Sequence, residues 1–187
     1  MAKRKLSDSS KAFRAPLDHL PPTANGRRSV SHLYPGMCRD IQRKFSLEAI
    51  VTTDNYGQGF ASFIDAWFYK DTPDFRIPRL NSAGHDFVGL WVLLSHAAPY
   101  YVMGQGSKGW SAKTASSYMP SFDGVDAFPS PAVKHLAHRI DTYLASQSLV
   151  RLHKNDLAGP LPAGYEVQSN LIDGQARLFD ALFFWFD

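Results

Sequence analysis

The stretch from Phe45 to Tyr69 decides the fold of this 187-residue chain. It reads Phe45-Ser-Leu-Glu-Ala-Ile-Val-Thr-Thr53, then Asp54-Asn-Tyr-Gly-Gln-Gly59, then Phe60-Ala-Ser-Phe-Ile-Asp-Ala-Trp-Phe-Tyr69. Apolar side chains alternate in the first part, and the middle part is rich in turn-forming residues. The last part also fits helical spacing, but its aromatic content and the preceding glycines favour a strand. We therefore expect an antiparallel hairpin.

Two segments outside the hairpin carry helical signals. The first, Pro35 to Lys44, begins with a proline, which suits the first turn of a helix. The second is clearer, because Ser130 can cap a helix that runs from Pro131 to about Gln147. One face of this second segment is apolar, formed by Val133, Leu136, Ala137, Ile140, Tyr143 and Leu144.

The region after the hairpin is expected to hold a further helix, a strand and a loop. The apolar run from Phe87 to Ala97 predicts a helix, with Asp86 as its N-cap and Pro99 as its stop. Tyr100 to Met103 predicts a short strand. Residues 104–130 are rich in Gly, Ser and Lys and predict a long loop region.

The rest of the chain completes an α+β prediction. Leu149 to Leu152 is expected to form a strand, and the apolar end from Leu178 to Asp187 a buried strand. The sequence thus predicts a mostly antiparallel sheet with two or three packed helices. Residues 32–187 are expected to form a single domain, preceded by a basic extension of residues 1–31 that contains Pro and Ser.

Charge divides the chain into two unlike parts. The net charge is +3, but residues 1–44 carry +7 and residues 45–187 carry −4. The pI near 9.0 therefore reflects the N-terminal segment rather than the body. The lone Cys38 excludes an internal disulfide framework, and no apolar run follows the basic N-terminus as in a secretory signal. The expected location is the cytoplasm, without a membrane partner.

One glycine pattern resembles the motif of dinucleotide-binding sites. The segment Gly104-Gln-Gly-Ser-Lys-Gly109 matches G-x-G-x-x-G and follows a predicted strand. A dinucleotide site requires a helix directly after these glycines, since its N-terminus holds the pyrophosphate. The residues that follow show no clean helical face, so a flexible turn is the favoured interpretation.

Signals for metal binding or catalysis are weak. His135 and His138 have a spacing that can place two imidazoles on one side of a helix, but no third ligand recurs nearby. Cys38 lacks an evident base, and no G-x-S-x-G nucleophile motif is present. Paired carboxylates would have to come from aspartates such as Asp123 and Asp126. We therefore expect no catalytic residue, no metal site and no cofactor.

The region 104–130 also carries isolated aromatic side chains. Trp110 and Tyr118 stand there among polar residues, with Lys108 nearby. Such residues can anchor a protein interface, stack on nucleic-acid bases, or tie a long loop to the core. The sequence leaves these three interpretations open.

Three segments together resemble a known class of proteins. They are Phe87-Val-Gly-Leu-Trp-Val-Leu-Leu94, Pro99-Tyr-Tyr-Val-Met-Gly104 and Leu178-Phe-Asp-Ala-Leu-Phe-Phe-Trp185. They resemble the small cytoplasmic immunity proteins of bacterial polymorphic toxin and type VI secretion systems. The resemblance covers about residues 33–187. It implies a compact α+β domain without catalytic residues that binds a cognate toxin stoichiometrically and blocks its active site.

An immunity function would need a partner-binding surface. Trp110 and Tyr118 would supply aromatic anchors, and Asp123 and Asp126 would add negative charge to fit a basic cleft of the toxin. The alternative is a nucleic-acid- or nucleotide-binding protein that uses the basic N-terminal segment and the Gly104–Gly109 loop.

Overall fold

The computed structural model describes residues 30–53, 60–78, 84–111, 115–161, 167 and 175–186. The helical elements, with η for 3₁₀ helices, are η1 (Ser31–Leu33), α3 (Tyr34–Phe45), η3 (Pro73–Phe75), η4 (Phe122–Gly124), α4 (Pro131–Ser146), α5 (Lys154–Leu157) and α6 (Leu178–Leu182). The strands are β1 (Glu48–Thr52), β2 (Phe60–Ala61), β3 (Phe63–Tyr69), β4 (Arg76–Ile77), β5 (Gly84–Ser95), β6 (Tyr100–Ser111), β7 (Ala115–Ser117), β8 (Val150–Arg151) and β9 (Trp185–Phe186).

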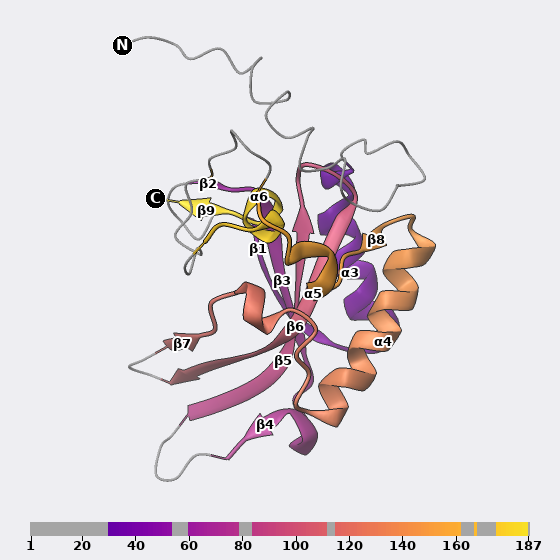
Figure 1. Cartoon of the computed structure of the whole chain (residues 1–187). Helices are drawn as coiled ribbons and strands as arrows, with labels where there is room; N and C mark the ends of the chain where they lie inside the picture. Colours follow the sequence, from indigo (N-terminus) through magenta and orange to yellow (C-terminus); the bar gives the residue numbers. More distant parts are fainter. Residues whose placement is uncertain are drawn as a thin grey trace, which may run out of the picture.

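A curled antiparallel sheet forms the centre of the fold (Figure 1). Its strand order is β1-β3-β5-β6-β7, with β4 paired to β5 and β8 paired to β6 in parallel. A second, small sheet joins β2 to β9. The predicted hairpin is confirmed, because β1 pairs with β3 antiparallel in a register that places Ile50 opposite Trp67. The α+β class is confirmed as well.

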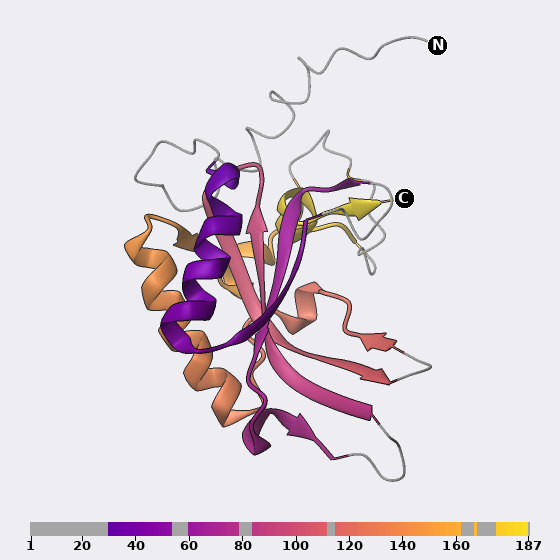
Figure 2. The ribbon, with the colours of Figure 1, turned by 180° about the vertical axis from the view of Figure 1, so that it is seen from behind.

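Helices α3 and α4 lie side by side on one face of this sheet, as the view from behind also shows (Figure 2). Both contribute buried apolar residues to the core, such as Ile41 of α3 and Ile140 of α4. The Tyr101 hydroxyl of β6 donates to the Asp141 carboxylate of α4 at 2.5 Å. Residues that pair directly across two strands point to the same face of the sheet. Leu94 of β5 pairs with Tyr101, which contacts α4, so the even-numbered residues of β5 face the helices and the odd-numbered ones face away.

Local signals explain both long helices. Pro35 and Pro131 each stand in a first turn, as predicted, and the Ser130 side chain accepts from the Val133 N–H at 3.4 Å. Helix α3 ends where Ser46 adopts a left-handed conformation, with φ of 52°. Its buried face includes Cys38, whose side chain is 1% exposed. Burial raises the pKa of the Cys38 thiol to about 12.

The predicted helix from Phe87 to Ala97 is wrong. These residues lie mainly in β5, an inner strand that pairs with β3 on one side and β6 on the other. Both faces of β5 are covered from Gly89 to Leu94, so this part is apolar throughout and lacks the alternation that marks a half-exposed strand. Asp86 is therefore a strand residue and not a helix cap.

The predicted loop over residues 104–130 is also wrong in its first part. Strand β6 continues from Tyr100 to Ser111, and β7 pairs with its end. The Gly104–Gly109 segment thus lies inside a strand, and the next element among the described residues is the strand β7 rather than a helix. This removes the geometry that a dinucleotide loop requires.

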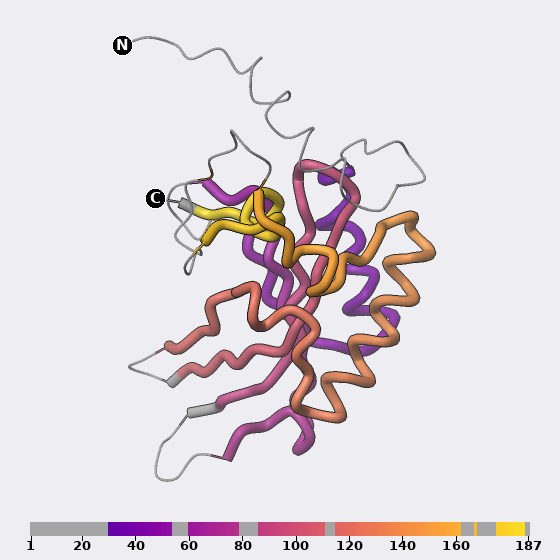
Figure 3. The backbone as a smooth tube through the Cα atoms, viewed as in Figure 1, coloured from indigo at the N-terminus to yellow at the C-terminus, as the bar shows by residue number. Residues whose placement is uncertain are grey.

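The C-terminal prediction is partly wrong. Leu178–Leu182 form the short helix α6, and only Trp185–Phe186 form a strand. The expected burial of Phe183 is confirmed, since its ring is 0% exposed, and Trp185 is half-buried. The backbone trace shows the C-terminal segment at the same end of the molecule as β2 (Figure 3). Of the predicted extension, residues 1–29 lie outside the described residues, while Val30 packs against the core.

Candidate partner-binding site

The face of the sheet that turns away from α3 and α4 carries a chain of aromatic contacts. The Tyr69 ring lies 4.6 Å from Trp67 and 4.8 Å from Phe87, measured between ring centroids. The Trp110 ring stacks on Phe87 at 5.4 Å and meets Tyr69 edge-on at 5.9 Å. Trp67 and Phe87 are buried, whereas Tyr69 and Trp110 are half-buried. We call these four residues the aromatic face.

Glycines of the neighbouring strands make room for this face. The Trp67 ring crosses β5 above Gly89, and its indole N–H donates to the Gly106 carbonyl at 3.3 Å. The Trp91 ring lies over Gly104, and a Cβ at Gly106 would lie 2.5 Å from the Tyr118 ring. Two glycines of the G-x-G-x-x-G pattern are therefore explained by the rings above them.

A carboxylate, a phenol and an amine meet beside the aromatic face. Asp65 of β3 is 2% exposed and accepts from the Tyr118 hydroxyl at 2.5 Å. The Lys108 ammonium lies 4.7 Å from the Tyr118 ring centre and donates to Ser117 Oγ at 2.9 Å. Burial lowers the pKa of Lys108, although the nearby Asp65 carboxylate opposes the shift. Three polar groups from β3, β6 and the residue after β7 are thereby held in fixed positions.

Two carboxylates lie near Tyr69 at the edge of this surface, Glu48 and Asp71, and the Asp71 carboxylate is paired with the Arg76 guanidinium at 2.7 Å. Burial raises the pKa of the Tyr69 hydroxyl, and the carboxylates of Glu48 and Asp71 raise it further. Ile50, which shares this face of the sheet, is 40% exposed. A surface with aromatic, apolar and charged groups side by side is typical of protein interfaces.

The Asp126 carboxylate contacts polar groups of three other residues of the chain. Its carboxylate accepts from the Arg151 guanidinium at 2.7 Å and the Lys154 backbone N–H at 2.9 Å, and lies 3.2 Å from His153 Nδ1. Burial alone would raise the pKa of Asp126. The Lys154 N–H, the Arg151 guanidinium and the His153 ring outweigh burial, so that the pKa is lowered. Arg151 also reaches Asp141 of α4 at 3.3 Å.

The four predicted interface residues do not form one cluster. The Asp126 N–H donates to the Met103 carbonyl of β6, and Trp110 lies seven positions further along that strand, about 23 Å away. Asp123 has an 84% exposed side chain that pairs with the Lys154 ammonium at 3.2 Å. Trp110 thus belongs to the aromatic face and Tyr118 binds Asp65 beside it, whereas Asp126 and Asp123 pair with Arg151 and Lys154.

Sequence reasoning missed Asp65 and the role of Lys108. A single Asp in the middle of the apolar run Phe60–Tyr69 was an available signal, since a buried carboxylate needs a partner. Within the described part of the chain no group of three or more His, Cys, Asp or Glu side chains could hold a metal ion. His135 and His138 are exposed on α4.

Comparison with known proteins adds no family. No family model matches the sequence, and no significant match is found among curated proteins or solved structures. None of the described helices is long and apolar enough to cross a membrane.

Proposed function

We propose that this protein is an immunity protein, which binds a cognate bacterial toxin in the cytoplasm and blocks its active site. The observation that carries the proposal is the aromatic face, with Tyr69 and Trp110 half-buried on a side of the sheet that the two long helices do not cover. The resemblance of the sequence segments to immunity proteins supports it.

The physics of this surface suits tight binding to a protein. Trp and Tyr are the side chains that most often dominate binding energy, because they bury a large area at a small entropic cost. The bonds that hold Tyr118 and Lys108 limit the freedom that these side chains lose on binding. The Glu48 carboxylate near Tyr69 is complementary to a basic cleft, as in enzymes that act on phosphates.

The alternative, a nucleic-acid- or nucleotide-binding protein, rested on two features of the sequence, the Gly104–Gly109 pattern and the basic N-terminal segment. The Gly104–Gly109 segment is a strand covered by Trp and Tyr rings rather than an open loop. The basic N-terminal segment remains, and it lies almost entirely outside the described residues. Binding through that segment would weaken steeply between low and moderate salt.

Co-expression with the product of the adjacent gene tests the proposal. We expect this neighbour to inhibit growth when expressed alone and to form a salt-resistant complex with the present chain. Titration calorimetry of Trp110→Ala should then show an affinity at least about thirtyfold weaker, the usual loss for an aromatic anchor. Phe60→Ala, which truncates an aromatic side chain that is 46% exposed on β2, is the matched control.

Three results would overturn the proposal. One is a product of the adjacent gene that does not inhibit growth or does not bind the present chain. Another is wild-type affinity in a folded Trp110→Ala protein, checked by circular dichroism. The third is a chain that binds only nucleic acid, with an affinity that collapses as salt rises.

A further inference from the structure

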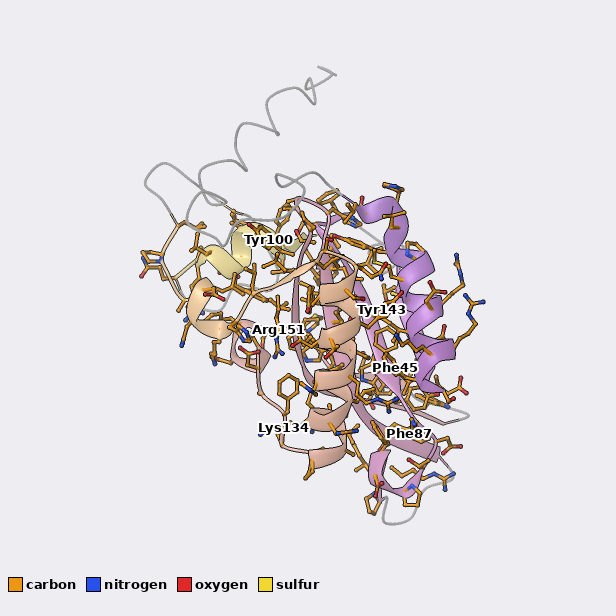
Figure 4. All side chains as sticks on the ribbon, turned by 90° about the vertical axis from the view of Figure 1, so that its right-hand side faces the viewer. Phe45, Phe87, Tyr100, Lys134, Tyr143 and Arg151 are labelled. Carbon is orange, nitrogen blue, oxygen red and sulfur yellow. The ribbon has the colours of Figure 1, made fainter. Side chains whose placement is uncertain are left out.

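A trough separates the outer surfaces of α3 and α4, on the side of the sheet opposite the aromatic face. Its first part encloses about 370 Å³. Phe45 and Tyr143 lie between the two helices (Figure 4), and their rings meet edge to face with the centroids 6.4 Å apart. Its lining consists of Lys44, Phe45, His138, Arg139, Thr142, Tyr143 and Ser146.

A second hollow of about 340 Å³ extends the trough towards η3. Arg139 lines both hollows, so the two are neighbours along α4. The second is lined by Lys70, Thr72, Asp74, Phe75, Ala132, His135, Leu136 and Arg139. Together they provide an elongated depression rather than a closed pocket, which suits an extended segment more than a compact small molecule.

The charge of the trough is positive although the body of the chain is negative. Lys44, Lys70 and Arg139 line it, with Asp74 as the one carboxylate of the two linings. Within the described residues no carboxylate lies at ion-pair distance from any of these three cations, whereas the nearby Asp40 is paired with Arg43. Three cations therefore share this surface with one lining carboxylate, Asp74, and with the Asp40 carboxylate that lies beside Tyr143.

The cations are positioned by the aromatic floor. The Arg139 guanidinium lies 4.6 Å from the centre of the Phe45 ring. The Lys44 ammonium lies 5.2 Å from the Tyr143 ring and 5.8 Å from the Phe45 ring. Cation–π contacts of this kind hold the charged groups in place at the surface. The Phe45 ring is 8% exposed and Phe75 is 6% exposed, so these two lining rings offer nucleobases little surface on which to stack.

We infer that this trough binds an extended acidic segment of a partner protein, whose carboxylates pair with Lys44, Arg139 and Lys70. Charge complementarity identifies the occupant as anionic, and the burial of the Phe45 and Phe75 rings favours carboxylates over nucleotides. The inference concerns the helical side of the molecule and stands independently of the proposed toxin-binding function.

Fluorescence anisotropy with the full-length chain tests the inference. The probe is a labelled peptide of alternating Glu and Ala, and a labelled oligothymidylate serves as the nucleic-acid comparison. We expect Lys44→Glu with Arg139→Glu to weaken peptide binding about tenfold or more at moderate salt. The milder pair Lys44→Gln with Lys70→Gln, which leaves the Arg139–Phe45 contact intact, should weaken it in the same direction.

Charge reversal elsewhere on the same helix provides the control. Lys134 is exposed on α4 but does not line the trough (Figure 4). Lys134→Glu should change the affinity by less than about twofold. The basic N-terminal segment is identical in all variants, so its own contribution cancels.

Two results would overturn the inference. The first is equal weakening by Lys134→Glu and by the trough variants, which would indicate attraction to net charge alone. The second is oligothymidylate binding that is tighter than peptide binding and equally sensitive to the trough substitutions, which would assign the trough to nucleic acid.

Discussion

At the level of single residues, glycines of the sheet leave the space that the tryptophan rings occupy. A Cβ at Gly89 would come 2.6 Å from the Trp67 ring and 2.7 Å from the Phe68 carbonyl oxygen. Gly89→Ala should therefore lower the free energy of unfolding by about 1–3 kcal/mol or more, as overpacked sites do. Gly36→Ala is the control, because a Cβ there meets nothing within 4 Å and Ala favours the helix.

Urea unfolding followed by tryptophan fluorescence checks this pair. Gly36→Ala should leave the stability unchanged or raise it by up to about 1 kcal/mol. Equal stability of the Gly89→Ala and wild-type proteins would show that Trp67 does not need its place above β5.

The lowered pKa of Asp126 predicts a pH dependence of stability. A carboxylate whose pKa is depressed in the folded state stabilises that state above its unfolded pKa, about 3.9, and loses this contribution as pH falls through the folded value. Asp126→Asn should therefore be less stable than wild type at pH 6, and the difference should shrink towards pH 3.

Thermal melts of the two proteins from pH 6 to pH 3 provide the measurement. Burial raises the pKa of Asp180, which gives the opposite slope with pH, but this group is the same in both proteins and cancels in their difference. A stability difference that stays constant over the whole range would mean that Asp126 is not ionised in the folded protein near neutral pH.

At the scale of elements, Ser62 connects the central sheet to the C-terminal segment. Its hydroxyl donates to the Leu182 carbonyl at 2.9 Å and accepts from the Phe184 N–H at 2.9 Å. Ser62→Ala leaves these backbone groups without that partner and should cost about 1–3 kcal/mol in chemical denaturation. Ser116→Ala on exposed β7 should change stability by less than about 0.5 kcal/mol, and an equal cost for both would exclude a joining role for Ser62.

Elements with local signals were predictable, and those without them were not. Helices α3 and α4 were predicted to within about one residue at each end, because prolines, a cap and an apolar stripe are encoded in neighbouring residues. Strand β5 was missed because burial on both faces removes its period of two. Gly89 was the available clue, since a glycine weakens a helix interior.

The candidate site was predictable only in part. Trp110 and Tyr118 are half-buried, and their role in binding a partner stays a prediction. Their contacts with Phe87, Tyr69 and Asp65 depend on strand register, which joins residues far apart in the chain. The ion pair between Asp126 and Arg151 is likewise long-range, so the sequence alone presented Asp126 as a free acidic group.

At the scale of the whole molecule, the basic composition of residues 1–29, with its prolines and serines, predicts that the domain folds without them. A chain that begins at Val30 keeps the residue that packs against the core and η1. We expect this truncated protein to unfold in one cooperative transition, with a thermal midpoint close to that of the full chain. Loss of cooperativity would mean that residues 1–29 contribute to the core.

The burial of Cys38 gives the protein a built-in reporter of its own opening. At neutral pH the Cys38 thiol is buried and protonated, so a disulfide reagent cannot reach it and finds no thiolate to react with. Reaction must wait until α3 separates from the sheet. The labelling rate, compared with that of a denatured sample, therefore measures how often the molecule opens. It does so without any introduced probe, and destabilising substitutions such as Gly89→Ala should accelerate it in proportion to the equilibrium population of the open form.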